Sequence, residues 1–138
     1  MTMVKASTAG QAQRFLRFLL FGGFAAGVNW SSRFAWSVLL PFGWAVLAAY
    51  ATGMVVAFFM FRTFVFEPGV DSLAVQARNF LIVNLVGMAA TWALAQVLVR
   101  HLFPAISMTF HPEAIGHGIA VLAPAITSWF GHRFLTFR

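Results

Sequence analysis

Four long apolar runs dominate this sequence, at residues 15–40, 44–64, 79–100 and 113–134. An α-helix rises 1.5 Å per residue, so about 20 apolar residues cross the hydrocarbon core of a bilayer. The runs therefore predict an all-α integral membrane protein with four transmembrane helices. Only 9% of the residues are charged, against about 25% in typical globular domains. We expect a single domain over residues 1–138, with a mobile cytoplasmic tail at 1–13.

A secretory signal peptide is the alternative for the first run, with Lys5 as its charged region and Ala25-Ala26-Gly27 as its cleavage site. The apolar region of a signal is usually about 7–15 residues long, which is shorter than residues 15–40. We therefore expect this run to remain as a helix.

Basic residues favour one side of the predicted bundle. Four spans place both termini on the same side, where seven basic residues are expected: Lys5, Arg14, Arg17, Arg62, Arg78, Arg133 and Arg138. The other side has Arg33 and Arg100. This asymmetry predicts cytoplasmic termini. The formal net charge of +6 does not indicate nucleic-acid binding, because the basic residues are scattered between apolar runs and form no stripe.

The two halves of the chain resemble each other. Residues 57–66 align with residues 128–137 at an offset of 133 − 62 = 71, which superposes Arg62 on Arg133. Residues 18–30 align with residues 80–92 at an offset of 80 − 18 = 62. These alignments predict two parallel helical-hairpin repeats, related by an axis along the membrane normal. Chance similarity between helices rich in Phe, Leu and Ala is the alternative.

The motifs in these repeats resemble those of the GtrA-like family of small four-helix membrane proteins. The resemblance covers the chain from about Arg14 to Phe137. It is carried by Arg17-Phe18-Leu19, Gly22-Gly23, Asn29, Phe58, Arg62 and Phe66. In that family the second and fourth helices end in a motif like Asn-Phe-x-x-Asn-Arg-x-x-x-Phe. This chain departs from it, with Ala57 and Phe61 in the first copy and Ser128 and His132 in the second.

The resemblance implies a role with polyprenyl-phosphate sugars. Members are proposed flippases for these lipids, or partners of the glycosyltransferases that make them. We therefore expect translocation of a polyprenyl-phosphate-linked sugar for cell-surface polysaccharide or glycan biosynthesis, in the bacterial inner membrane. The alternative is a membrane subunit that anchors a polyprenyl-phosphate glycosyltransferase. Expected partners are the sugar lipid, membrane lipids and such a glycosyltransferase.

Four arginines are expected at the cytoplasmic interface: Arg17, Arg62, Arg78 and Arg133. The planar guanidinium group matches phosphate oxygens bidentately and stays charged at physiological pH. These residues are candidate ligands for the lipid phosphate. The alternative is that they only set topology and attract anionic lipids.

Polar residues within the apolar runs are candidates for a translocation path, namely Asn29, Asn84 and Thr91. Unpartnered polar groups are costly in lipid, so their faces should point into the bundle. The alternative role is hydrogen bonding between helices. We expect Arg33 to extend outward to the interface and His117 to lie at the outer interface.

Gly53 and Pro124 correspond at the offset of 71 and are candidate helix breaks, which in transporter repeats point to the binding site. Small-residue spacings, Gly23-xxx-Gly27 and Ala49-xxx-Gly53, allow close packing within the bundle or a homo-oligomer.

The positions of the acidic residues argue against a multidrug transporter that exchanges protons for its substrate, because such a transporter needs a carboxylate embedded in the membrane. Glu67, Asp71 and Glu113 all lie outside or at the ends of the predicted spans, where none can serve as an embedded proton-exchanging carboxylate. The sequence shows no catalytic set and no metal-ligand cluster, and it contains no cysteine. We therefore expect neither an enzyme nor a cofactor or metal.

Overall fold

The computed structural model describes residues 8–66 and 69–137, and every regular element within these ranges is helical. The elements are α1 (Thr8–Trp36), α2 (Phe42–Met60), η1 (Phe61–Val65), α3 (Leu73–Val97), η2 (Leu98–Leu102), α4 (Phe103–Ala105), α5 (Pro112–Leu122), α6 (Ala125–Gly131) and η3 (His132–Thr136). The η segments are π-helical. The expected turn at Glu67-Pro68 and the tail at 1–7 lie outside the described residues.

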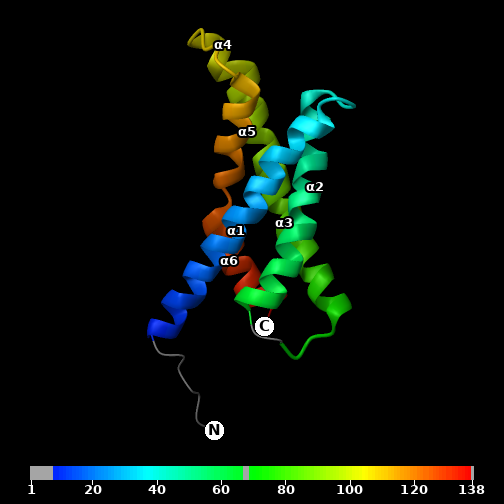
Figure 1. The fold of residues 1–138 in the computed structure, drawn as a ribbon, viewed down its shortest axis with the longest axis vertical. Helices are drawn as coiled ribbons and strands as arrows, with labels where there is room; N and C mark the ends of the chain where they lie inside the picture. Colours follow the sequence, from blue (N-terminus) through cyan, green and yellow to red (C-terminus); the bar gives the residue numbers. More distant parts are fainter. Residues whose placement is uncertain (1–7, 67–68, 138) are drawn as a thin grey trace.

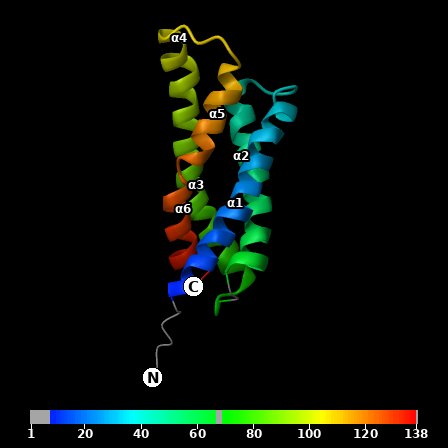
Figure 2. The ribbon, with the colours of Figure 1, turned by 60° about the vertical axis from the view of Figure 1, so that its left-hand side comes forward.

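The helices form an elongated bundle (Figure 1). The helices α1 and α2 run antiparallel to each other. Helix α3 then runs back toward α4, and α5 and α6 return in the opposite direction (Figure 2). As a result, α1 begins and η3 finishes at the same end of the bundle. We call this the arginine end, because Arg17, Arg62, Arg78 and Arg133 lie toward it, and the opposite end the α4 end.

Two segments are both long and apolar enough to cross a bilayer, Phe42–Val65 and Leu73–Ala105. Helix α1 has 29 residues, but its polar residues around Asn29 and Arg33 reduce its hydropathy. The last helix is interrupted at Pro124, which separates α5, with 11 residues, from α6, with 7. Length and hydropathy therefore single out the second and third helices only.

Helix boundaries differ from the expected spans at several ends. Helix α1 begins at Thr8, within the segment expected as a tail, and ends at Trp36 rather than at residue 40. Residues 37–40 form turns that lead to Pro41. Proline fixes its backbone φ angle and suits the residue just before or at a helix start, and α2 accordingly begins at Phe42.

Each half of the chain ends in a π-helical turn at the arginine end. The amide of Phe66 donates to the carbonyl of Phe61, and the amide of Phe137 donates to the carbonyl of His132, both at 2.9 Å. The two turns are 132 − 61 = 71 residues apart. Their last rings, Phe66 and Phe137, stack on each other with centroids 5.0 Å apart.

A cluster of six aromatic residues and one valine fills the core next to the arginine end. It consists of Phe18, Phe61, Val65, Phe66, Phe80, Trp129 and Phe137, and we call it the aromatic layer. Aromatic pairs in such contacts each contribute about 0.5–1.5 kcal/mol beyond their buried area. This gain from packing matters in a bilayer, where lipid is as apolar as the core and the hydrophobic effect does not hold helices together.

Helices α1 and α2 pack closely at Gly53. A Cβ atom there would lie 2.7 Å from the Cβ atom of Asn29 and 3.0 Å from the carbonyl oxygen of Ala25. Glycine is thus needed for the close approach. Helix α2 continues through Gly53 without interruption, so the expected break in the second helix does not occur.

Candidate functional site

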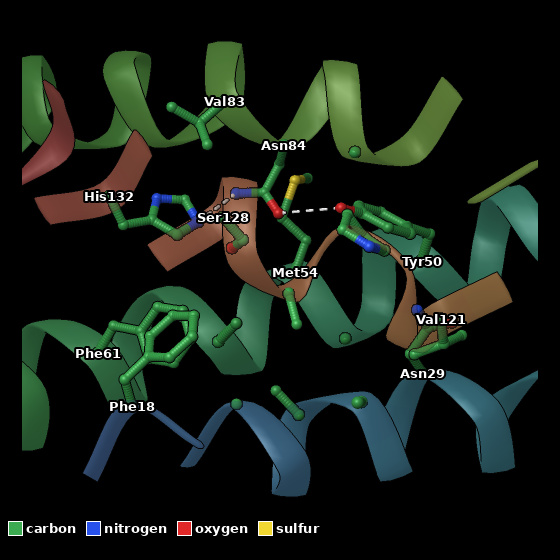
Figure 3. Close-up of a pocket in the computed structure, with 18 of the residues that line it drawn as sticks. Phe18, Asn29, Tyr50, Met54, Phe61, Val83, Asn84, Val121, Ser128 and His132 are labelled. Carbon is green, nitrogen blue, oxygen red and sulfur yellow. Dashed lines mark hydrogen bonds between the residues drawn. The ribbon is translucent and has the colours of Figure 1, made fainter. Parts of the chain in front are cut away.

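A cavity of about 410 Å³ lies between the helices (Figure 3). Its walls come from α1, from α2 with η1, from α3, and from α5, α6 and η3. Sites for small molecules are usually about 300–1,000 Å³. The cavity therefore has the size of a ligand site, and most of its lining is apolar.

A chain of hydrogen bonds crosses the bundle at this cavity. The Tyr50 hydroxyl donates to Asn84 Oδ1 at 3.3 Å, and Asn84 Nδ2 lies 3.2 Å from His132 Nε2. His132 Nδ1 lies 3.1 Å from the Thr136 hydroxyl. Because an amide nitrogen can only donate, His132 accepts at Nε2 and carries its proton on Nδ1. The chain thus joins α2, α3 and η3 across the cavity wall (Figure 3).

The four candidate phosphate ligands lie on different elements. Arg62 Nε donates to Gln76 Oε1 at 3.1 Å, and Arg78 donates to Asn79 Oδ1 at 3.3 and 3.4 Å. The Arg133 guanidinium lies 5.7 Å from the Trp129 ring centre. Arg17, like Arg62 and Arg78, is exposed. None of these four described side chains lines the cavity.

The aromatic layer separates these arginines from the cavity. Phe18 and Phe61 belong to the layer and also line the cavity, with their ring centres 5.0 Å apart. Phe18 further contacts Trp129, whose ring centre is 5.0 Å away. The layer thus borders the cavity on the side of the arginine end.

The cavity reaches the surface sideways, between α1 and the α5–α6 segment. Leu19 and Leu122 both line it, yet they are 46% and 68% exposed. The opening is bounded toward the arginine end by the contact of Phe15 with Trp129, whose ring centres are 5.1 Å apart. Toward the α4 end it is bounded by Trp30, which donates to the Ala114 carbonyl at 2.8 Å.

The sequence matches a known family model. A model described as the GtrA/DPMS transmembrane domain covers residues 17–137. The chain belongs to this family. The family predicted from the sequence is thereby confirmed, and GtrA/DPMS membership together with two long apolar helices makes the chain a membrane protein associated with polyprenyl-phosphate sugars. Searches of curated proteins and of solved structures give no significant match.

The departures from the GtrA-like motif meet at the cavity. Phe61 and His132, which replace asparagines of the motif, both line the cavity, with ring centres 5.6 Å apart. His132 is also stacked on Phe80 with a centroid distance of 4.4 Å. Ser128 lines the cavity as well. In this GtrA/DPMS protein the motif positions therefore face the same space from two halves of the chain.

The expected path residues occupy different positions. Asn29 and Asn84 line the cavity, from α1 and α3 respectively. Thr91 is fully buried outside the cavity wall, and its hydroxyl donates to the Ala120 carbonyl at 3.5 Å. The two expected helix breaks, Gly53 and Pro124, both line the cavity. Only Pro124 interrupts its helix.

Two expectations about the α4 end are wrong. Arg33 does not extend to the interface: it is 3% exposed, and its Nη1 donates to Ser37 at 3.1 Å and to Glu113 at 3.4 Å. The ring of Phe34, 4.3 Å from the guanidinium, covers it. His117 is 0% exposed rather than interfacial. In both cases α5 packs against α1 and encloses the polar side chain.

Sequence reasoning missed the roles of two hydrogen-bonded cavity residues, Tyr50 and His132. Tyr50 is the only tyrosine of the chain and stands in the middle of an apolar run. A lone hydroxyl in such a run needs a partner within the bundle, and this signal could have identified it. The sequence marks His132 only as a departure from the family motif.

Proposed function

We propose that this protein translocates a polyprenyl-phosphate-linked sugar across the membrane, as a step in cell-surface polysaccharide or glycan biosynthesis. The observation that carries the proposal is the cavity, which presents Asn29 and Asn84 inside the bundle and opens sideways. A sideways opening suits such a ligand because its isoprenoid tail can stay among the bilayer lipids while the sugar enters. The protein then has to shield only the headgroup.

In this proposal the four helices cross the bilayer as two parallel hairpin repeats, with both termini in the cytoplasm of a bacterial cell. The π-helical turns η1 and η3 begin 132 − 61 = 71 residues apart, which equals the offset of the sequence alignment, and this agreement supports the repeat. The gathering of basic residues at one end supports the orientation, since basic residues favour the cytoplasmic side.

The four arginines would bind the phosphate before the headgroup moves. Arg62 donates to Gln76 through Nε, which leaves its terminal nitrogens directed elsewhere. Guanidinium groups bind phosphate oxygens in pairs of hydrogen bonds. We propose neither a covalent step nor a cofactor for this protein.

A second candidate function is anchoring of a polyprenyl-phosphate glycosyltransferase. It is favoured by the exposure of Arg17, Arg62 and Arg78, which lie on the surface rather than in the cavity. A cytoplasmic enzyme could dock on this basic surface. In that case the interior of the cavity would not affect product formation.

Reconstitution in vesicles tests both candidates. The purified protein is incorporated with a labelled polyprenyl-phosphate sugar, and the movement of the label between leaflets is measured. Asn84→Leu removes a polar group from the cavity wall, and a membrane hydrogen bond contributes about 0.6–2 kcal/mol. We therefore expect transfer to fall roughly threefold to thirtyfold.

Thr91→Val is the matched control, because Thr91 is buried on the same helix outside the cavity. It should leave transfer unchanged. If the wild-type protein moves no label, the translocation proposal is wrong. If Asn84→Leu transfers at the wild-type rate, the headgroup does not depend on this polar group of the cavity wall.

A further inference from the structure

We propose that Gln76 is a positioning residue of the phosphate site, which holds the guanidinium group of Arg62 in place for the phosphate of the lipid-linked sugar. The inference rests on the proposed function, in which Arg62 is one of the phosphate ligands. It adds a residue of α3 that acts on the phosphate through Arg62 and does not itself contact the ligand.

The side chain of Gln76 is fixed at both ends of its carboxamide. Gln76 lies near the start of α3 and is 3% exposed. Its Oε1 accepts a hydrogen bond from Arg62 Nε at 3.1 Å, and its Nε2 donates to the Asp71 carbonyl at 3.1 Å. An arginine side chain can only donate and a carbonyl can only accept. The carboxamide therefore has one orientation that satisfies both partners, and Gln76 is a fixed anchor for Arg62.

The hydrogen bond at Nε determines which edge of the Arg62 guanidinium can bind a ligand. A guanidinium group binds an oxyanion bidentately either through Nε and one terminal nitrogen or through its two terminal nitrogens. Gln76 occupies Nε, and the side chain of Arg62 is exposed. The edge that remains for a phosphate is therefore the pair of terminal nitrogens.

This anchoring should favour binding because it orders the arginine before the ligand arrives. A long side chain loses rotamer freedom when it closes on a ligand, and a partner that orders it beforehand reduces this cost. Arg62 belongs to η1 and Gln76 to α3. Their hydrogen bond thus also fixes the guanidinium group relative to the third helix.

A similar arrangement recurs one turn later on α3. Asn79 Oδ1 accepts from Arg78 at 3.3 and 3.4 Å, and Asn79 Nδ2 donates to the Leu135 carbonyl at 2.9 Å. Each carboxamide thus joins one candidate phosphate ligand to a backbone carbonyl. Residues three apart lie on one face of a helix, so a single face of α3 carries both anchors. Gln76 is the more buried of the two and holds an arginine of a different element.

Arg133 is held in a different way. Arg62 corresponds to Arg133 at the offset of 71, whereas Gln76 corresponds to Arg14 at the offset of 76 − 14 = 62. No carboxamide therefore stands at the equivalent position in the first half of the chain. The Arg133 guanidinium lies instead 5.7 Å from the ring centre of Trp129. The effect of Gln76 should accordingly be confined to Arg62.

The test measures how much the phosphate contributes to lipid binding. Binding of farnesyl phosphate and of farnesol to the full-length protein is measured in nanodiscs of phosphatidylcholine, a lipid without net charge. The ratio of the two affinities isolates the phosphate, and binding of farnesol shows that the variant is folded. Gln76→Leu should lower the ratio about threefold to tenfold, because the hydrogen bond that orders Arg62 is lost. Gln76→Met, an unbranched side chain of similar length, should give the same result and replaces Gln76→Leu if that variant does not fold.

Double variants separate positioning from a purely structural role. In an Arg62→Ala background, Gln76→Leu should not lower the ratio further, because the residue that it positions is gone. In an Arg133→Ala background the full effect should remain. Ser72→Ala is the structural control, since the Ser72 hydroxyl accepts from the Val75 amide at the start of the same helix. It alters the helix start and should leave the ratio unchanged.

Three results would overturn the inference. They are a wild-type ratio in the folded Gln76 variant, an equal effect of Gln76→Leu with and without Arg62, and a wild-type protein that binds farnesyl phosphate no better than farnesol. Each is a result about binding, so the vesicle assay still decides translocation separately. Transfer by the wild-type protein together with normal phosphate binding by Gln76→Leu would refute the positioning role alone.

Discussion

Phe61 and His132 face each other at the arginine end of the cavity, with ring centres 5.6 Å apart, although 71 residues separate them. Each begins a π-helical turn, and each replaces an asparagine of the GtrA-like motif. Their contact joins the two halves of the chain where the aromatic layer borders the cavity.

This contact should be measurable as an energetic coupling. Phe61→Leu and His132→Asn should each lower the free energy of unfolding, and the double variant should deviate from additivity by about 0.5–1.5 kcal/mol. Unfolding in mixed detergent micelles provides the measurement. As a control, Phe59→Leu alters an exposed ring on the same helix, and its effect should add to that of His132→Asn. If the effects of Phe61→Leu and His132→Asn on the free energy of unfolding were also additive, the coupling would be contradicted.

The arginines should matter for lipid binding through their geometry as well as their charge. We expect Arg62→Ala and Arg133→Ala each to weaken binding of a polyprenyl phosphate about tenfold, because charge-assisted hydrogen bonds contribute about 1.5–3 kcal/mol. Lysine at either position should restore only part of the affinity. Arg100→Ala, an exposed arginine near the α4 end, is the control and should bind normally. Full rescue by lysine would mean that these residues supply charge alone.

The sideways opening can be blocked without disturbing the core. Gly23 lines the cavity, and a Cβ atom there would have no neighbour within 4 Å, so Gly23→Phe should fold normally. The added ring would occupy the mouth between α1 and the α5–α6 segment, and transfer of the labelled lipid in vesicles should fall at least tenfold.

Gly27→Phe is the matched control for that experiment. Gly27 has equally open surroundings on α1 but lines a separate surface hollow. Equal transfer by both variants would show that the headgroup does not enter through this opening.

The membrane topology can be tested by cysteine labelling, because the chain contains no cysteine. Val70→Cys and Phe110→Cys introduce thiols at exposed sites, which are 97% and 72% exposed. In intact cells, a membrane-impermeant reagent should label Cys at position 110 and not at position 70. Labelling of both sites from outside would rule out the four-span arrangement.

The helices were predictable from the sequence because long apolar runs can satisfy their backbone in lipid only as helices. The gathering of Arg62 and Arg133 at one end also followed from the repeat. The position of these arginines relative to the cavity could not be predicted, because the aromatic layer that borders the cavity is built from side chains of all four helical segments.

The sequence predicts less well which face of each helix points into the bundle. Helix α2 is apolar on all sides, so its pattern does not distinguish lipid-facing residues from buried ones. Only isolated polar residues mark the interior. This worked for Asn29 and Asn84, but it failed for Arg33 and His117, whose burial depends on how α5 packs against α1.

The stack of Phe66 on Phe137 has a consequence for the symmetry of the bundle. These residues are equivalent at the offset of 71, and so are Phe61 and His132, yet each pair is in mutual contact. A residue touches its own equivalent only beside a rotation axis, as in the isologous interface of a two-fold homodimer. These contacts are the ones that a symmetric dimer of two helical hairpins would make. Phe18 on Phe61 and Phe80 on His132 are equivalent contacts in the two halves, whereas the hydrogen bond from Asn84 to His132 has no counterpart at the equivalent pair, Gly22 and Phe61, where the ring only lies near the glycine.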